Sequence, residues 1–322
     1  MTYFFAKSFE NINRNSLLLA VDVLFSDTDY VMVLGGVFTY TDVELVDFSE
    51  HKNMTLPKPA NLPEAMHGSV AALVKDQVIA CGGSGIRKCF IYDFALNKWD
   101  PTVSLDIDRW GAASFVFRDD WYILGGEFIT EGSSPYLDTT IIYRNGNFET
   151  GQKLPSPAFY PCVVPVNGTH VFYAGGYEGP GGKSDAYLLE VAIWKWTRLD
   201  DMVYGRYKHS CGKAGSDIVV VGGCCSNLVK TTSEIFSLET MYWTSGPAIP
   251  QTPDGSLSNA AVAQFENTFF ILGGLSGNTR LDSVFEFDAM NIVWKKRKEK
   301  LSTGKFDHAV VAIPNRLLHP GK

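Results

Sequence analysis

The sequence has no uninterrupted run of about 18 apolar residues, the length that a membrane-spanning helix requires. Its first residues, which include Glu10, also lack the continuous apolar segment of a secretion signal. Lysine and arginine are outnumbered by aspartate and glutamate, 28 to 35, so the formal net charge is −7. A nucleic-acid duplex or an anionic membrane surface would on average repel such a chain. We therefore predict no nucleic-acid partner, no membrane association and a cytoplasmic location.

Cysteine is also scarce, with six residues in the chain, and none of them stands in a CxxC pair. This spacing argues against a zinc module and against a disulfide framework, so we expect reduced thiols, no metal and no cofactor. The pair Cys224-Cys225 is unusual, but adjacent cysteines rarely bridge and Lys230 is the one cation close to them in sequence. We therefore favour a structural interpretation of this pair over a reactive thiol.

The sequence does contain a repeated pattern of four mostly apolar residues followed by two glycines. Successive copies are separated by 47, 43, 50, 47 and 51 residues, and this even spacing indicates an internal repeat. The pairs are Gly35-Gly36, Gly82-Gly83, Gly125-Gly126, Gly175-Gly176, Gly222-Gly223 and Gly273-Gly274. We expect glycine at these positions either because a side chain would collide with neighbouring segments or because the backbone needs a dihedral angle that only glycine tolerates.

A tryptophan recurs in phase with the glycine pairs. Trp196, Trp243 and Trp294 each follow the second glycine of a pair by 20 residues, and Trp99 follows Gly83 by 16. Short strands and turns lie between the two markers, and a further strand precedes the glycines, so each repeat contains four strands. One twisted sheet of this size cannot bury both faces alone and must stack on its neighbours. We therefore predict an all-β fold, a six-bladed β-propeller, in which tryptophan is a wedge between adjacent blades.

An apolar run with Gly-Gly, a tyrosine-aspartate-like pair and a later tryptophan, repeated about every 47 residues, resembles the Kelch repeat. The first copy has no tryptophan, the third has Phe148 instead, and the fourth reads YLLEVAI where the tyrosine-aspartate pair would stand. The resemblance implies a propeller over residues 26–314, between an N-terminal extension (1–25) and a C-terminal tail (315–322). It also implies that a strand from one terminus closes the ring, and we favour residues 306–313 over residues 17–24.

Two local patterns resemble sites of other kinds. GGKS, residues 181–184, looks like the end of a phosphate-binding loop, but Tyr177 stands where the first glycine of that loop is needed, and the segment that follows favours a strand over a helix. His67, His209 and His308 stand where three first strands begin and are of the type that holds zinc or copper. Because we interpret them as one equivalent repeat position, we favour a role in packing between blades.

In six-bladed Kelch domains that recruit proteins, binding residues come from the loop after each glycine pair and from the loop that enters the next first strand. The resemblance implies the same loops here, and the residues after the glycines are Val37, Ser84, Glu127, Tyr177, Cys224 and Leu275. The partner contacts that we predict are Arg109, Arg206, Tyr177, Tyr160, Tyr207, Ser84, Glu127 and Lys183. Arginine binds carboxylates bidentately and tyrosine supplies rigid contact area, so the partner would be a protein or peptide of acidic character. An alternative of equal weight is that the arginines bridge blades.

The resemblance thus implies a binding module without catalysis. Many relatives carry a BTB domain and act as substrate receptors of ubiquitin ligases, which suggests a recognition or scaffold role, although the 25 residues before the first repeat cannot hold such a domain. The alternatives are a propeller enzyme, of the sugar mutarotase or metal-dependent oxidase or lyase type, and an actin-binding protein that uses the basic run at residues 295–300. We otherwise interpret that run as a solvated strand edge. No catalytic constellation is legible in the sequence.

Overall fold

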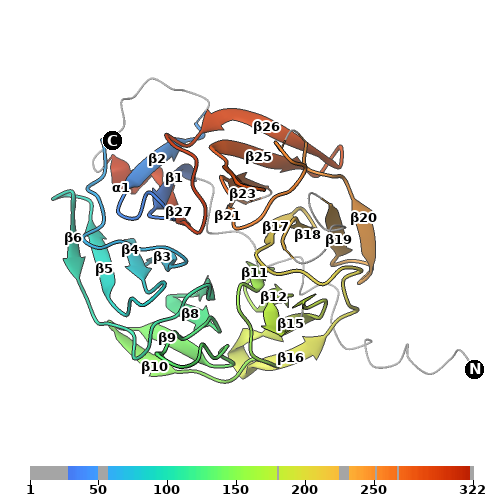
Figure 1. Ribbon diagram of the computed structural model, residues 1–322, viewed down its shortest axis with the longest axis horizontal. Helices are drawn as coiled ribbons and strands as arrows, with labels where there is room; N and C mark the ends of the chain where they lie inside the picture. Colours follow the sequence, from blue (N-terminus) through green and yellow to red (C-terminus); the bar gives the residue numbers. More distant parts are fainter. Residues whose placement is uncertain are drawn as a thin grey trace, which may run out of the picture.

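The structure is a computed structural model, and it describes residues 28–49, 57–179, 181–224, 232–250, 252–266 and 268–319. In this part of the chain, six antiparallel sheets are arranged in a ring around a central axis (Figure 1). Five sheets have four strands and the sixth has three described strands. The fold is therefore the six-bladed β-propeller that the repeat predicts.

The blades follow one another along the chain. Blade 1 contains β27 (Ala309–Pro314), β1 (Thr28–Leu34) and β2 (Val43–Asp47). Blade 2 contains β3 (Val70–Val74), β4 (Gln77–Cys81), β5 (Cys89–Asp93) and β6 (Lys98–Pro101). Blade 3 contains β7 (Ala113–Phe117), β8 (Asp120–Leu124), β9 (Thr140–Arg144) and β10 (Asn147–Thr150).

The second half of the ring repeats this order. Blade 4 contains β11 (Cys162–Pro165), β12 (His170–Ala174), β15 (Ala186–Glu190) and β16 (Lys195–Arg198). Blade 5 contains β17 (Ser210–Ala214), β18 (Asp217–Val221), β19 (Ser233–Ser237) and β20 (Trp243–Gly246). Blade 6 contains β21 (Ala261–Gln264), β22 (Phe269–Leu272), β25 (Ser283–Asp288) and β26 (Val293–Lys300).

Short elements complete the described chain. Two small hairpins follow glycine pairs: β13 (Tyr177–Gly179) with β14 (Gly181–Gly182), and β23 (Leu275–Ser276) with β24 (Thr279–Arg280). The helices are a 3-10 turn (Val191–Ile193) and α1 (Asn315–Leu318). Among the described residues, no helix is long and apolar enough to cross a membrane.

The first blade contains strands from both ends of the chain. β27 pairs antiparallel with β1, from Thr28 opposite Pro314 to Leu34 opposite Ala309. β27 also lies against β3 and β21, the inner strands of blades 2 and 6, so it is the inner strand of blade 1. Residues 17–24, the other candidate for this position, lie outside the described residues.

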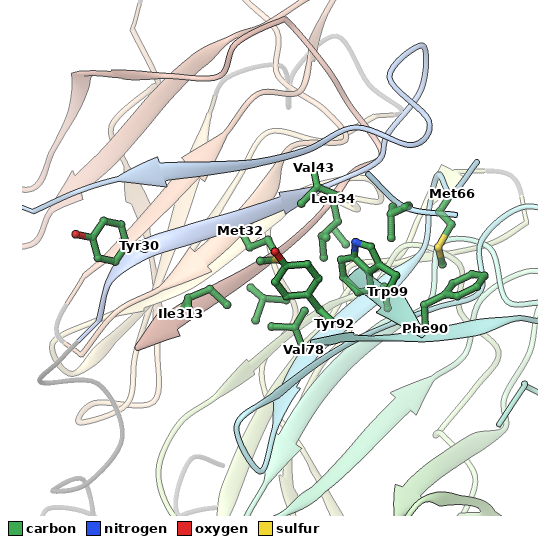
Figure 2. Close-up of a cluster of buried hydrophobic side chains, with 14 residues drawn as sticks. Tyr30, Met32, Leu34, Val43, Met66, Val78, Phe90, Tyr92, Trp99 and Ile313 are labelled. Carbon is green, nitrogen blue, oxygen red and sulfur yellow. The ribbon is translucent and has the colours of Figure 1, made fainter. Parts of the chain in front are cut away.

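The tryptophans lie between blades, as the repeat predicts. The indole N–H of Trp99 donates to the carbonyl of Ala60, in the linker from blade 1 to blade 2, at 2.9 Å. The Trp99 ring packs in a core cluster with Met32 and Leu34 of blade 1 and Phe90 of its own blade (Figure 2). Buried aromatic area and a satisfied N–H together join one blade to the next.

The same contact recurs where the copies are less regular. Trp243 and Trp294 donate to the carbonyls of Asp200 and Pro247 in the linkers that precede their blades. In blade 4 this linker contact belongs to Trp194, which donates to the Lys153 carbonyl, whereas Trp196 packs against Tyr173 and Tyr187. In blade 3, Phe148 stands on a fully formed outer strand, β10. The segment that follows β2 in blade 1 includes residues 50–56, which lie outside the described part.

Candidate interaction surface

Contacts between neighbouring blades repeat at the glycine pairs. The N–H of each second glycine donates to a carbonyl oxygen in the loop that enters the next blade, at 2.8 to 3.4 Å. The acceptors are Met66, Arg109, Ala158, Arg206, Leu257 and Lys305. At Gly175 and Gly176, φ is +66° and +99°, and a Cβ on Gly175 would lie 2.6 Å from the Arg206 oxygen. Both the backbone conformation and the close approach therefore require glycine.

The residue after each glycine pair makes a second repeated contact. Its N–H donates to a carbonyl in the loop that enters its own blade, at 2.8 to 3.2 Å. The donors are Val37, Ser84, Glu127, Tyr177, Cys224 and Leu275, and the acceptors, in the same order, are Phe306, His67, Trp110, Phe159, Tyr207 and Ser258. The two loop types that were expected to bind a partner are thus held side by side in every blade.

A set of six residues, which we call the inner ring, follows these acceptors and surrounds the axis. Its members are Gly68, Gly111, Tyr160, Lys208, Asn259 and Asp307, all with φ between +52° and +60°. We call the boundary between two neighbouring blades a seam. At five of the six seams, the N–H of one inner-ring member donates to the carbonyl of the preceding member, at 2.7 to 3.1 Å. The backbone is therefore nearly the same at each position, while the side chains differ.

The side chains of the inner ring close the mouth of the ring. The Tyr160 hydroxyl, from the loop entering blade 4, donates to Asp307 Oδ1 of the opposite blade 1 at 2.8 Å. Asn259 donates to the same oxygen. A Cβ on Gly111 would lie 2.7 Å from the Tyr160 ring, so the tyrosine occupies the space that a larger residue there would need. Burial, followed by the Asp307 charge, raises the pKa of Tyr160 well above its usual value.

Around this closed mouth lies a continuous arc of aromatic side chains, which we call the aromatic rim: Trp110, Tyr136, Phe159, Tyr177 and Tyr207. Ring centroids are 5.2 Å apart for Trp110 and Phe159, 5.7 Å for Phe159 and Tyr136, 5.4 Å for Tyr136 and Tyr177, and 4.9 Å for Tyr177 and Tyr207. Four of the five side chains are half-buried and Phe159 is buried. The rim spans blades 3 to 5.

One cation stands within this arc. The Lys208 ammonium lies 5.2 Å from the centroid of the Tyr160 ring and 5.7 Å from that of Tyr207. Glu127 is buried nearby, and burial raises the pKa of its carboxyl while the Lys208 charge lowers it. The surface thus offers aromatic area, one accessible positive charge and the half-buried Ser84 at its blade 2 side. Of the partner contacts predicted from the sequence, Tyr177, Tyr207 and Ser84 lie on this surface, whereas Lys208, Trp110 and Tyr136 also lie on it and were not predicted.

Arg109 and Arg206 are not on this surface, which corrects the expectation that they contact a partner. They are 1% and 0% exposed, and their guanidinium groups join loops within the ring. Arg109 donates to the carbonyls of Gly125 and Thr139, at 3.0 and 3.1 Å. Arg206 pairs with the buried Glu234 at 2.9 Å. These side-chain contacts lie within the blade that each arginine's loop enters, so they do not support the alternative that the guanidinium groups bridge blades. The link to the preceding blade is made by the backbone carbonyl of each arginine.

Lys305 is a third buried cation at the equivalent position, and sequence reasoning missed it. Its side chain is fully buried and pairs with Glu44 of blade 1 at 2.8 Å, while its carbonyl accepts from Gly274 of blade 6. The signal was present in the sequence, because Arg109, Arg206 and Lys305 each stand two residues before an inner-ring member.

Lys183, in the loop that resembles a phosphate-binding loop, is also held internally. Its ammonium donates to the Ser156 hydroxyl and the Pro157 carbonyl, and it pairs with Glu178 at 3.2 Å. These contacts hold the loop of Lys183 in place. Because its side chain is 14% exposed, Lys183 is poorly placed to contact an acidic partner. The strand β15 follows this loop, as the aromatic and β-branched sequence predicts.

The histidines do not share one repeat position. His67 precedes an inner-ring residue, whereas His209 and His308 follow one. A Cβ on Gly175 would lie 2.7 Å from Cε1 of His209, and one on Gly273 would lie 2.9 Å from Cε1 of His308, so both imidazoles pack against the first glycine of the preceding blade. Burial lowers the pKa of each imidazole to about 3. Within the described residues, no group of three or more His, Cys, Asp and Glu side chains could hold a metal ion.

The structure corrects the expectation that the cysteines are reduced. Cys81 and Cys89, cross-strand neighbours on β4 and β5, form one disulfide. Cys162 on β11 and Cys211 on β17 form a second, between blades 4 and 5, with Cα atoms 6.0 Å apart. Cys224 is a free, half-buried thiol, and Cys225 lies outside the described residues.

The basic run at residues 295–300 lies on β26, the outer edge strand of blade 6. Lys295 pairs with Asp288 at 2.5 Å, and Arg297 pairs with Glu286 at 2.8 Å. The run is therefore the solvated strand edge that we expected, and charges there oppose pairing with another chain.

Comparison with known proteins agrees with this architecture. The family model described as the KLHDC2/KLHL20/DRC7 Kelch-repeats domain matches residues 111–321, more than half of the chain. The chain is a Kelch-repeat protein. The likeness of this Kelch-repeat protein to the solved structure of YjhT, with a TM-score of 0.70 at 13% identity over 88% of this chain and 100% of that one, shows the shared fold alone.

Relatives of the Kelch-repeat protein are more distant over their full length. Kelch domain-containing protein 10 from Homo sapiens is 24% identical over 246 residues, covering 71% of this chain and 55% of that protein. The Xenopus tropicalis protein of the same name is 23% identical over 249 residues, covering 71% and 60%. F-box/kelch-repeat protein At1g67480 from Arabidopsis thaliana is 28% identical over 150 residues, covering 42% and 39%. The chain therefore spans little more than half the length of the first two relatives.

Replacement of Arg206 tests its role as a fastener between loops. In Arg206→Ala, Glu234 would remain buried without a cationic partner, so we expect the free energy of unfolding to fall by about 3–5 kcal/mol. Arg198→Ala, which removes an exposed pair with Asp201, should leave the free energy of unfolding nearly unchanged. Urea unfolding of both variants measures this, and equal losses would contradict the assignment.

The buried imidazoles predict loss of stability in acid. His209 and His308 stay neutral in the folded protein, whereas the unfolded chain binds protons near pH 6.5. Their contribution is therefore fully present above pH 6.5 and is lost as the pH falls towards 3, by up to about 1.4 kcal/mol per pH unit for each imidazole.

Urea unfolding at pH 7, 6, 5 and 4 tests this expectation. The slope of unfolding free energy against pH should flatten in His209→Gln/His308→Gln but not in His319→Gln, a control near the C-terminal end. The same slope in all three proteins would show that other groups cause the acid loss.

Proposed function

We propose that the aromatic rim and the Lys208 ammonium form the surface through which this Kelch-repeat protein binds a peptide or protein partner. Membership of the Kelch-repeat family supports a protein-interaction module in general. The observation that carries the specific proposal is the unbroken series of ring contacts from Trp110 to Tyr207, around a mouth that Tyr160 and Asp307 close. Rigid, half-exposed aromatic side chains give contact area at low entropic cost and are enriched at binding hot spots.

The charge of this surface favours a partner with acidic residues near its apolar contacts. Lys208 lies over two tyrosine rings and is not committed to an ion pair in the described part of the chain. No accessible charge comes from the buried cations Arg109, Arg206 and Lys305. We therefore assign the preference for an acidic partner to Lys208 in place of the arginines.

The same surface supports recognition without catalysis. Two titratable side chains at the axis, those of Tyr160 and Asp307, are joined by a hydrogen bond and close the mouth. We further propose a substrate-recognition or scaffold role of the ubiquitin-ligase type, in the cytoplasm. A relative that is named for an F-box together with Kelch repeats supports this finer assignment.

Substitution on the rim tests the proposal. Tyr177→Ala/Tyr207→Ala removes two adjacent half-exposed rings, whereas Tyr242→Ala removes a 65% exposed tyrosine next to the β19–β20 turn. We expect the rim variant to lose roughly 30-fold or more in partner affinity, the loss typical of a hot spot, and the control to bind as the wild type does.

Affinity purification with mass spectrometry would identify the partner, and titration with that partner would give the affinities, after thermal unfolding confirms that the variants fold. If the rim variant and the wild type recover the same proteins with the same affinity, the binding surface lies elsewhere.

A further inference from the structure

The seam between blades 4 and 5 differs from the other five in its inner-ring contact. Within the described residues, the N–H of Lys208 does not donate to the carbonyl of Tyr160, whereas the equivalent bond is formed at every other seam. The disulfide Cys162–Cys211 crosses this same seam, and its cysteines stand two residues after Tyr160 and three residues after Lys208. The seam without the ring hydrogen bond is thus the seam with the covalent link.

This seam also divides the aromatic rim. Phe159 and Tyr177 belong to blade 4, whereas Tyr207 and Lys208 belong to the loop that enters blade 5. The ring contact between Tyr177 and Tyr207, at 4.9 Å, and the placement of Lys208 over Tyr160 therefore both depend on how the two blades are held together.

We propose that Cys162 and Cys211 form a redox-sensitive clip. The disulfide holds the two halves of the aromatic rim in register, and its reduction lets the blade 4–blade 5 seam open more often. The effect on the seam is independent of the proposed function, whereas the effect on a partner rests on it. In a reducing cytoplasm the clip is open, and an oxidising change closes it.

The chemistry is thiol–disulfide exchange with a low-molecular-weight disulfide such as oxidised glutathione. The thiolate of one cysteine attacks a glutathione sulfur, which breaks the glutathione disulfide, forms a mixed disulfide and releases one glutathione thiolate. The second cysteine thiolate then displaces the other glutathione. Two protein thiols lose two electrons and two protons, and oxidised glutathione becomes two thiols. Cys162 and Cys211 are 4% and 6% exposed, so exchange requires the seam to open.

The other disulfide supplies a matched control. Cys81 and Cys89 are only 8 residues apart and link β4 to β5, strands that already pair within one blade, whereas Cys162 and Cys211 are 49 residues apart and link two blades. Closure of the longer loop restricts the open states more. Cys81→Ser/Cys89→Ser should therefore leave the seam under redox control, and Cys162→Ser/Cys211→Ser should abolish that control.

Hydrogen exchange of the full chain, in a buffer with either reduced or oxidised glutathione, tests the clip. In the wild type, we expect peptides around residues 159–165 and 206–212 to exchange roughly tenfold faster in the reduced than in the oxidised protein. The Cys81→Ser/Cys89→Ser control should show the same difference between its reduced and oxidised forms. Alkylation and peptide mapping should show that Cys162 and Cys211 are protected from alkylation in the oxidised protein and are alkylated in the reduced protein. Equal exchange in both buffers, or free thiols at both sites after oxidation, would overturn the proposal, and the wild-type comparison decides this even if a variant does not fold.

Partner affinity measured in the same two buffers separates the clip from the proposed function. If reduction weakens binding and the Tyr177→Ala/Tyr207→Ala variant binds weakly in both buffers, the clip regulates the rim. If the seam responds to redox state but the tyrosine variant binds normally, the clip stands and the proposed binding surface fails.

Discussion

The propeller depends on one repeated hydrogen bond, from the N–H of the second glycine of each blade to the carbonyl of the loop that enters the next. The bond forms because the glycine pair turns the chain through positive φ at the end of the second strand and lets that loop come close. In the Gly175–Arg206 example, a single Cβ would remove this approach. Each evenly spaced glycine pair therefore marks a contact between two blades as well as the end of a strand.

Three of the residues whose carbonyls accept this bond are cations and meet a second constraint, since a buried cation needs a counter-charge or hydrogen-bond acceptors. The chain solves this in three ways at equivalent positions. Arg206 pairs with the buried carboxylate of Glu234, and Lys305 pairs with the carboxylate of Glu44 in blade 1, the blade that its own loop enters. Arg109 donates to two carbonyls and a threonine hydroxyl. The cations occur at the entrances of blades 1, 3 and 5, and apolar residues occupy the same position in blades 2, 4 and 6.

The sequence could predict the features that the repeat makes visible. Blade number, strand content and the tryptophan wedges follow from spacing and from apolar pattern, which are local in the chain. The role of Arg206 could not be predicted in the same way, because a surface arginine that binds a carboxylate and a buried arginine that binds Glu234 have the same sequence signature. The pairing of Cys162 with Cys211 could not be predicted either, because these cysteines lie on adjacent inner strands that are a whole repeat apart in the sequence.

The inner ring places different residue types at equivalent positions of the six blades. Its six members share one backbone conformation, which glycine adopts freely and which asparagine and aspartate adopt more readily than most other residues. Tyr160 and Lys208 are less suited to it, and they are the two members on either side of the seam where the ring hydrogen bond is not formed. A left-handed backbone conformation at a residue other than glycine costs free energy, and this cost motivates a functional interpretation of these two side chains. The side chains of these two residues close the mouth and place a charge within the aromatic rim, so the seam without the ring hydrogen bond lies within the surface that we propose for partner binding.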